Sequence, residues 1–272
     1  MLQRTILSSG ETIPVIGLGT WQTFDVSRSG NEPLAQVLAN MHQSGGKLID
    51  SSPMYGRAEE NIGDLTQASG IADQFFYATK VWTQGKEAGI RQMEASLQKM
   101  KRRSIDLMQV HNLVDWKTHL ETLAEWKEKG IVRYIGITHY TNTYHDELER
   151  ILQTVSLDFV QFNYSITARN AEKRLLQTAA DRGVATLINR PFGEGSLFAH
   201  VRGKALPHWV SEYNITTWSQ FFLKFILSHP AVTCVIPATG NPQHLLDNVQ
   251  AGIGPLPNET TRERMAAFMA SL

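Results

Sequence analysis

Short runs of apolar, β-branched residues alternate with longer stretches of helical periodicity along most of the chain. Eight such pairs run from about residue 15 to about residue 250, an order that predicts parallel strands joined by helices. The expected strands cover residues 16–19, 47–50, 75–79, 106–110, 134–137, 159–162, 184–188 and 233–236. The helices are expected to begin near Asn31, Glu59, Lys86, Trp116, Asn142, Asn170, Thr216 and Pro242. Eight units favour a closed (β/α)8 TIM barrel, with an open doubly wound sheet as the alternative.

Both ends of the chain carry further elements. Apolar stretches at residues 5–7 and 12–14 flank the sequence SSGE, which predicts a β-hairpin over residues 4–14 that plugs one end of the barrel. Residues 258–272 predict a last helix that packs Met265, Phe268 and Met269. Residues 192–213 lack clear periodicity, and so long a loop in a compact domain is usually functional. We expect residues 1–272 to form a single domain.

Composition narrows the classes of partner. The 272 residues carry 26 Lys and Arg against 26 Asp and Glu, so no excess of cations indicates nucleic acid or an anionic membrane. A single cysteine, Cys234, excludes an internal disulfide and any multi-cysteine metal site, and it lies in an apolar run typical of a core. Because no apolar segment resembles a signal peptide or a membrane span, we expect a cytoplasmic protein, or a periplasmic one if a precursor signal was removed.

Reactive side chains stand at the ends of three consecutive expected strands. Asp50 ends the second strand and Tyr55 follows it, Lys80 follows the third strand, and His111 follows the fourth. The carboxyl ends of barrel strands open on one face, so these four side chains are expected to converge. Taken singly, each has an ordinary structural explanation. Together they can form a general acid, with Tyr55 as the proton donor and Lys80 lowering the pKa of its phenol from the usual value of about 10. Asp50 would hold the lysine, and His111 would orient a substrate carbonyl oxygen.

The same segments carry the motifs of a known family. Residues 45–56 read GGKLIDSSPMYG and continue as EENIG at 59–63, while residues 13–21 read IPVIGLGTW, 78–82 read ATKVW and 105–111 read IDLMQVH. In this order and spacing, the chain resembles the aldo-keto reductase superfamily over nearly its whole length, in the short-loop bacterial form. The resemblance implies a (β/α)8 barrel that reduces aldehydes or ketones to alcohols by transfer of the 4-pro-R hydride. It assigns catalysis to Asp50, Tyr55, Lys80 and His111, with Tyr55 as the general acid.

The resemblance also implies which residues contact the cofactor and the substrate. Thr138 and His139 stand where the family has the serine and asparagine that bind the nicotinamide carboxamide, and Gln161 matches the neighbouring glutamine. Asn189 stands in place of the aromatic residue that stacks on the nicotinamide. Arg190 would either replace that stacking with its planar guanidinium or bind the pyrophosphate. The other cofactor contacts are expected at Gly19, Thr20, Trp21, Asp50, Pro191, Phe192, Gly193, Ser196, Leu197, Pro237, Ala238, Thr239, Asn241, His244, Asp247 and Asn248. The substrate pocket is expected to be lined by Trp21, Tyr55, Trp82 and His111.

The adenosine end of the expected site departs from the family pattern. Ala238 stands for a lysine and His244 for an arginine, and these two cations bind the 2′-phosphate of NADPH in the family. The resemblance favours NADP(H), and NAD(H) stays open because a neutral histidine is a weak phosphate partner. The expected partner is a small aldehyde or ketone, without nucleic acid, membrane or metal, and the expected state is a monomer.

Two other functions stay open at this point. One is a nicotinamide-binding redox sensor or regulatory subunit with slow turnover, as in the potassium-channel β subunits of the same fold. The replaced aromatic at Asn189 and the altered carboxamide contacts motivate it. The other is an unrelated barrel enzyme, an isomerase or aldolase that uses Lys80 as a Schiff base, which would leave Tyr55 and Asp50 unexplained.

Overall fold

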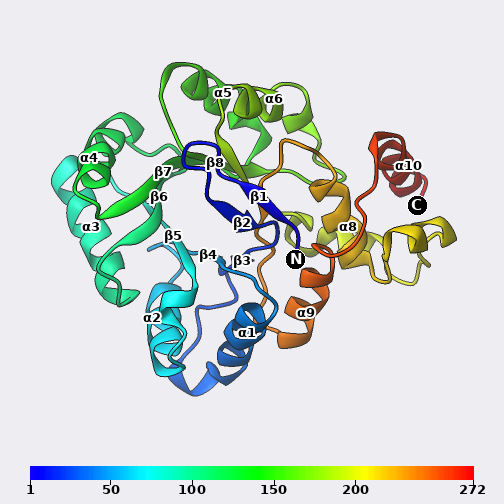
Figure 1. Ribbon diagram of the computed structural model, residues 1–272, viewed down its shortest axis with the longest axis horizontal. Coiled ribbons are helices and arrows are strands. Elements are labelled where there is room, and N and C mark those ends of the chain that lie inside the picture. The colour runs from blue at the N-terminus through cyan, green and yellow to red at the C-terminus, as the bar shows by residue number, and fades with distance from the viewer.

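Eight parallel strands form a barrel in the computed structural model, which describes residues 1–272 (Figure 1). Each strand pairs with its neighbours in chain order, from β3 to β10. The barrel closes between its first and last strands, where parallel bridges join Ile16 to Val235 and Gly19 to Ala238. This closure confirms the (β/α)8 barrel and excludes the open sheet. The strands are β3 (Leu18–Gly19), β4 (Leu48–Asp50), β5 (Phe76–Val81), β6 (Ile105–His111), β7 (Val132–Thr138), β8 (Phe159–Asn163), β9 (Ala185–Asn189) and β10 (Cys234–Val235).

Helices follow the strands and surround the barrel. They are α1 (Glu32–Gln43), α2 (Ala58–Ala68), α3 (Lys86–Lys99), α4 (Trp116–Glu128), α5 (His145–Thr154), α6 (Leu175–Asp181), α7 (Ser196–His200), α8 (Trp218–Leu227), α9 (Pro242–Gln250) and α10 (Glu259–Ala270). Every expected helix is present, although those expected from Asn142 and Asn170 start with a turn of 3-10 helix. The stretch 192–213 is more ordered than its sequence pattern indicated, because it contains α7 and two 3-10 segments.

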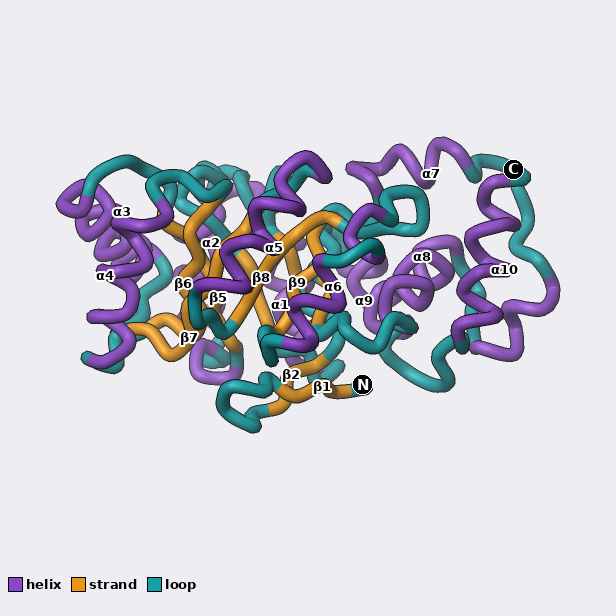
Figure 2. The backbone as a smooth tube through the Cα atoms, turned by 90° about the horizontal axis from the view of Figure 1, so that it is seen from above, coloured by secondary structure: helices purple, strands orange, loops and turns teal.

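The barrel interior is filled by apolar side chains that point inward from alternate strand positions, and the N-terminal hairpin adds to them. β1 (Gln3–Thr5) pairs antiparallel with β2 (Thr12–Pro14). Ile6 and Ile13 from this hairpin pack in the same buried cluster as Phe76, Phe159 and Cys234. Figure 2 shows the hairpin beneath the strands, at the end opposite to α7. The expected plug is therefore confirmed, and it leaves the other end of the barrel open for a site.

A second and larger apolar cluster lies between the strands and the surrounding helices. α8 contributes most of its length to this cluster, because nearly all of its residues are buried. The side chain of Thr217 caps the helix by accepting a hydrogen bond of 3.2 Å from Gln220 N. The C-terminal helix buries Met265 and Met269, with Phe268 packed beside them. None of the helices combines the length and the apolar character needed to cross a bilayer.

Candidate functional site

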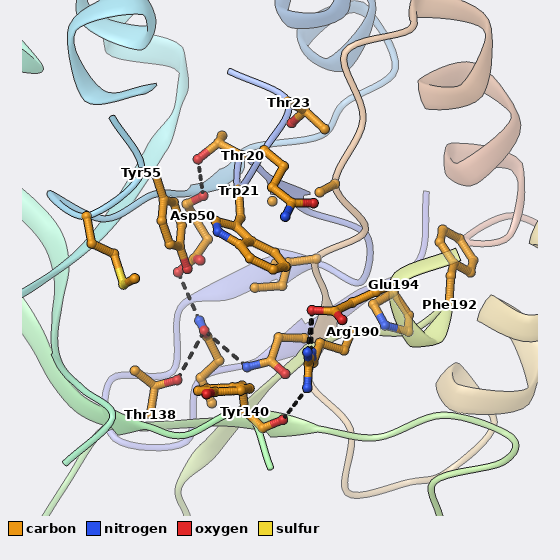
Figure 3. Close-up of a pocket in the computed structure, with 18 of the residues that line it drawn as sticks. Thr20, Trp21, Thr23, Asp50, Tyr55, Thr138, Tyr140, Arg190, Phe192 and Glu194 are labelled. Carbon is orange, nitrogen blue, oxygen red and sulfur yellow. Dashed lines mark hydrogen bonds and ion pairs between the residues drawn. The ribbon is translucent and has the colours of Figure 1, made fainter. Parts of the chain in front are cut away.

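A cavity of about 740 Å³ opens at the carboxyl ends of the strands (Figure 3). Its size lies within the range of small-molecule and cofactor sites. Many of the residues expected at the site line it: Gly19, Thr20, Trp21, Asp50, Tyr55, Trp82, His111, Thr138, Gln161, Asn189, Arg190, Pro191, Phe192 and Ala238. The strand ends thus bring together side chains that are far apart in sequence, as the geometry of a parallel barrel requires.

The floor of the cavity holds a buried ion pair. Lys80 Nζ lies 2.6 Å from Asp50 Oδ2 and donates a second hydrogen bond of 2.7 Å to the carbonyl oxygen of Ser51. Lys80 is the fifth residue of β5, one position before the strand ends, and it lies below the cavity surface. Burial would lower the pKa of Lys80, but the charge of Asp50 outweighs that effect, and the net shift is upward. The lysine is therefore cationic at neutral pH.

Tyr55 lies over this ion pair. Lys80 Nζ is 5.1 Å from the centre of the Tyr55 ring, close enough for its charge to act on the phenol. Burial nevertheless raises the pKa of Tyr55 above its usual value, and the opposing effect of Lys80 is smaller. The expectation that Lys80 brings this pKa below its usual value is therefore wrong for the chain without ligand. The phenol is held protonated, which is the state that a proton donor needs.

His111 ends β6 beside the phenol. Its ring meets that of Tyr55 edge-on, with 5.9 Å between the ring centres. Burial and the charge of Lys80 lower the pKa of His111 to about 2, so the imidazole is neutral. Its Nδ1 lies 3.0 Å from the hydroxyl oxygen of Ser52. If Ser52 donates to Nδ1, the ring proton is on Nε2, and the imidazole can donate a hydrogen bond to a ligand.

A group of amides extends the site from Asp50 across the barrel. Gln161 Nε2 donates 2.9 Å to Asp50 Oδ1, and Gln109 Nε2 donates 3.1 Å to the same oxygen. Gln161 Oε1 accepts hydrogen bonds from Thr138 Oγ1 at 3.2 Å and Asn189 Nδ2 at 3.4 Å. Asn189 Oδ1 is buried and has no hydrogen-bond partner. A buried acceptor without a partner is costly, so this atom is suited to a ligand that brings an N–H group.

His139 lies behind the wall of the cavity and does not line it. Its ring stacks on Tyr144, with 3.6 Å between the ring centres, and Nδ1 accepts a 3.0 Å hydrogen bond from Tyr140 N. Burial lowers the pKa of His139 to about 4. In place of His139, the next residue, Tyr140, faces the cavity and is 43% exposed.

Arg190 follows β9 directly and reaches across the mouth of the cavity. Its guanidinium pairs with the carboxylate of Glu194 and donates a hydrogen bond of 3.2 Å to the carbonyl oxygen of Tyr140 (Figure 3). It also lies over the Tyr140 ring, 4.8 Å from its centre. Arg190 and Glu194 both adopt left-handed backbone conformations, with φ of 51° and 56°. Such conformations are uncommon for non-glycine residues and are found disproportionately at binding sites.

Nine of the other expected cofactor contacts lie outside the cavity lining: Gly193, Ser196, Leu197, Pro237, Thr239, Asn241, His244, Asp247 and Asn248. Several of them are held by contacts within the protein. Asn241 caps α9, because its side chain accepts a hydrogen bond of 2.8 Å from Gln243 N. Asp247 accepts hydrogen bonds from Thr217 and Gln220, and Asn248 accepts one from Ser219. These contacts tie α9 to the start of α8.

The cavity also includes residues that the sequence analysis did not single out: Gln22, Thr23, Met54, Asn112, Tyr140, Glu194, Gly195, Phe198 and Ile236. Several of them directly adjoin expected site residues, such as Asn112 after His111 and Met54 before Tyr55. These neighbouring residues could have been predicted from the sequence, because they adjoin residues already expected at the site. Glu194 and Phe198 lie in the aperiodic stretch 192–213, for which the sequence pattern predicts no position.

The chain is similar to known proteins both in sequence and in fold. A family model described as the aldo/keto reductase family matches residues 15–265. Among curated proteins, an aldo-keto reductase of Mycobacterium sp. (strain KMS) is 26% identical over 250 residues, covering 89% of this chain and 84% of that protein. The methylglyoxal reductase YeaE of Escherichia coli is 25% identical over 260 residues, covering 91% and 89%. A crystal structure of a Klebsiella pneumoniae aldo/keto reductase with NADP and acetate superposes with a TM-score of 0.84 at 20% identity, covering 99% and 96%.

Proposed function

Because the chain belongs to the aldo/keto reductase family, we propose that it reduces aldehydes or ketones to alcohols with a nicotinamide cofactor, and that Tyr55 supplies the proton. The observation that carries this proposal is the buried Asp50–Lys80 pair under a protonated Tyr55, with a neutral His111 beside it. Asp50, Tyr55 and His111 line one cavity, and Lys80 lies just below its surface.

The chain's own residues act on the proton and on the carbonyl oxygen. Tyr55 donates its phenolic proton to the oxygen as a hydride reaches the carbonyl carbon, which yields the alcohol and leaves a phenolate. Lys80 lies close enough to stabilise that phenolate. Asp50 keeps the lysine in place and balances its charge. The phenolate regains a proton from solvent before the next turnover.

His111 positions the carbonyl group. In the tautomer set by Ser52, its Nε2–H donates to the substrate oxygen while the oxygen gains negative charge. A neutral donor suits this task, because an imidazolium would compete with Tyr55 as the acid. The low pKa of His111 keeps the ring neutral over the whole physiological range.

The residues of the cavity fit a nicotinamide cofactor, which when bound supplies the hydride. The unpartnered Asn189 Oδ1 lies beside Gln161 and Thr138, and an amide acceptor of this kind suits the N–H group of a nicotinamide carboxamide. We propose NADP(H) as the preferred cofactor, supported by the similar Klebsiella pneumoniae enzyme, whose structure contains NADP. Ala238 and His244 leave NAD(H) as the alternative, and titration with both cofactors decides between them.

The substrate side of the cavity is apolar and uncharged. Trp21, Met54 and Trp82 line it, each about two-fifths exposed. Such a surface suits small to medium aldehydes and dicarbonyls with apolar or aromatic substituents. The similar Escherichia coli protein is named a methylglyoxal reductase, so methylglyoxal belongs in the first substrate panel.

The test follows absorbance at 340 nm with NADPH or NADH against methylglyoxal and a series of aromatic and aliphatic aldehydes. Tyr55→Phe removes the proton and keeps the ring, so it is expected to abolish turnover while cofactor affinity, read from tryptophan fluorescence, stays within about twofold of the wild-type value. Tyr144→Phe is the matched control, because Tyr144 is exposed and lies outside the cavity lining. Turnover by Tyr55→Phe at the wild-type rate would refute the proposed acid.

The second candidate is a nicotinamide-binding sensor with slow turnover. Asn189 favours it, since an amide in place of the family's stacking aromatic changes the contact with the nicotinamide ring. Tight retention of cofactor, one round of oxidation with each carbonyl tested and no multiple turnover would support the sensor over the reductase.

A further inference from the structure

We propose that Gln109 is a positioning residue for the proton transfer, because its side-chain amide holds Oδ1 of Asp50 and leaves Oδ2 facing Lys80. Gln109 does not line the cavity, so it acts through the buried ion pair and not on a ligand. The inference rests on the proposed function, since it takes Tyr55 as the proton donor. Neither the motifs nor the strand-end positions assign a role to Gln109.

Gln109 lies in a polar layer directly above the apolar interior of the barrel. It is the fifth residue of β6, on the same face as Leu107 of the interior cluster and His111 at the cavity wall. Its register partner on β5 is Lys80, so the two side chains lie next to each other on the inner face of the barrel. Gln109 is fully buried. A buried amide is costly unless its polar atoms are hydrogen-bonded, so its partners decide whether it can be tolerated there.

The Asp50 carboxylate has different donors on its two oxygens. Oδ1 accepts from Gln109 Nε2 at 3.1 Å and from Gln161 Nε2 at 2.9 Å, whereas Oδ2 accepts from Lys80 Nζ at 2.6 Å. Two amide donors on one oxygen fix the rotation of the carboxylate about its Cβ–Cγ bond. They also stabilise its negative charge without adding a cation, because an amide is a neutral donor. The carboxylate is therefore held with its other oxygen aimed at the lysine.

The two glutamines differ in their other hydrogen bonds. Gln161 lines the cavity, and its Oε1 accepts from Thr138 and Asn189, which lie beside the proposed nicotinamide site. The side chain of Gln109 is hydrogen-bonded only to Asp50 and, through a long contact of 3.4 Å to its Oε1, to Gln161. A change at Gln109 should therefore affect the ion pair and leave the contacts with the cofactor in place.

The ion pair acts on the ionisation of the phenol above it. Burial raises the pKa of Tyr55, and of the two charges nearby, Lys80 lowers this pKa while Asp50 raises it. His111, the other titratable group beside the phenol, is neutral. Without the amide of Gln109, more of the carboxylate charge is left uncompensated, so the phenol should become harder to ionise. The phenolate that forms during reduction should then be less stable, and proton transfer should be slower.

The pH profile of carbonyl reduction by the full chain tests the proposal. Gln109→Met has a similar volume and no amide, so it should lower kcat about tenfold while KM for the aldehyde and Kd for the cofactor stay within about twofold of wild type. The pH above which kcat falls should move upward, because that fall reports the ionisation of Tyr55. Gln109→Glu keeps the size but can donate to Asp50 only while its own carboxyl group is protonated, so its kcat should fall at a lower pH than that of wild type. Gln177→Met is the matched control, because Gln177 donates a hydrogen bond of 2.7 Å to Asp181 on the exposed side of α6.

Urea unfolding gives a second measurement that does not depend on turnover. Gln109→Met and Lys80→Met each remove a donor from the same carboxylate, so their effects on the free energy of unfolding should not add. The effects of Gln177→Met and Lys80→Met should add, because these two residues share no partner.

Several results would overturn the positioning role. One is an unchanged kcat and pH profile in Gln109→Met. A lower kcat with an unmoved pH profile would show that Gln109 only fills space, and weaker cofactor binding as the main effect would show that it acts through Gln161. Additive effects of Gln109→Met and Lys80→Met in urea would show that the two residues act independently. A wild-type protein that reduces no carbonyl would refute the proposed function instead, and the urea measurement would still decide whether Gln109 is coupled to the ion pair.

Discussion

The buried pair of Asp50 and Lys80 should contribute strongly to stability as well as to the site, and Lys80→Met tests this. Methionine has a similar length and no charge, so it fills most of the same space. The replacement removes the partner of Asp50 Oδ2 and the donor to the Ser51 carbonyl oxygen. Asp50 keeps only the two glutamine donors on its other oxygen. The variant therefore leaves a carboxylate at 2% exposure with no cation beside it and no donor to Oδ2.

Loss of one partner of a buried ion pair typically costs about 3 to 5 kcal/mol. Against a usual total stability of about 5 to 15 kcal/mol, this cost is a large fraction. The same reasoning predicts that a second change can restore most of it. In the double variant Lys80→Met with Asp50→Asn, the buried charge is gone, and the asparagine oxygen still accepts from Gln109 and Gln161. We expect the double variant to regain at least half of the lost free energy of unfolding.

Urea unfolding at pH 7, followed by tryptophan fluorescence, measures these differences. Lys86→Met is the matched control, because Lys86 pairs with Glu125 at 2.9 Å while both side chains are nearly half exposed. The control should unfold at the same urea concentration as wild type. A Lys80→Met variant no less stable than the control would refute the expected cost of the unpaired charge. A double variant as unstable as the single one would show that poorer packing, and not the unpaired charge, causes the effect.

Two further predictions concern the histidines. Ser52→Ala removes the proton donor to His111 Nδ1, so the ring can adopt the tautomer without a proton on Nε2. We expect kcat to fall about tenfold while the Kd of the cofactor stays unchanged. Ser52→Thr keeps the hydroxyl and should retain activity. An unchanged kcat in Ser52→Ala would exclude this role. His139 is neutral in the folded protein, where its pKa is about 4, whereas the pKa of an unfolded histidine is about 6.5. The stability that the neutral ring contributes is therefore complete above pH 6.5 and is lost as the pH falls toward 4. His139→Gln should therefore reduce the loss of unfolding free energy between pH 7 and pH 5 by about 1 to 2 kcal/mol, and an unchanged pH dependence in urea unfolding would contradict it.

The architecture of the protein was determined by patterns that are local in the sequence. All five residues of β8 are buried because both faces of a barrel strand are covered, and the apolar residues Phe159, Val160 and Phe162 of this strand are visible without any tertiary information. The polar residue at the end of such a run must then lie at the carboxyl rim. This is why Asp50, Lys80 and His111 could be brought together from their strand positions alone. The hairpin could also be predicted from the sequence, because two short apolar runs flank a turn sequence.

Other features were decided only by the three-dimensional structure. The pKa of Tyr55 depends on the balance between its burial and the charge of Lys80, and the effect of burial is the larger of the two. His139 does not line the cavity because the chain turns after β7 and stacks its ring on Tyr144, and Tyr140 lines the cavity instead. A motif comparison assigns a residue to a position, but not the direction of its side chain.

The pairing of Arg190 with Glu194 depends on tertiary structure most of all. Glu194 lies in the aperiodic stretch 192–213, so the sequence pattern predicts neither its conformation nor its partner. Both residues have left-handed backbone conformations, their side chains form an ion pair, and the carbonyl oxygen of Tyr140 that Arg190 contacts follows a different strand. Hydrophobic patterning determines which residues are buried and in what order the elements follow, because apolar residues repeat along each element with the period of a strand or a helix. The direction of a single polar side chain on a loop depends on a few contacts between distant segments, and only the folded chain brings those segments together.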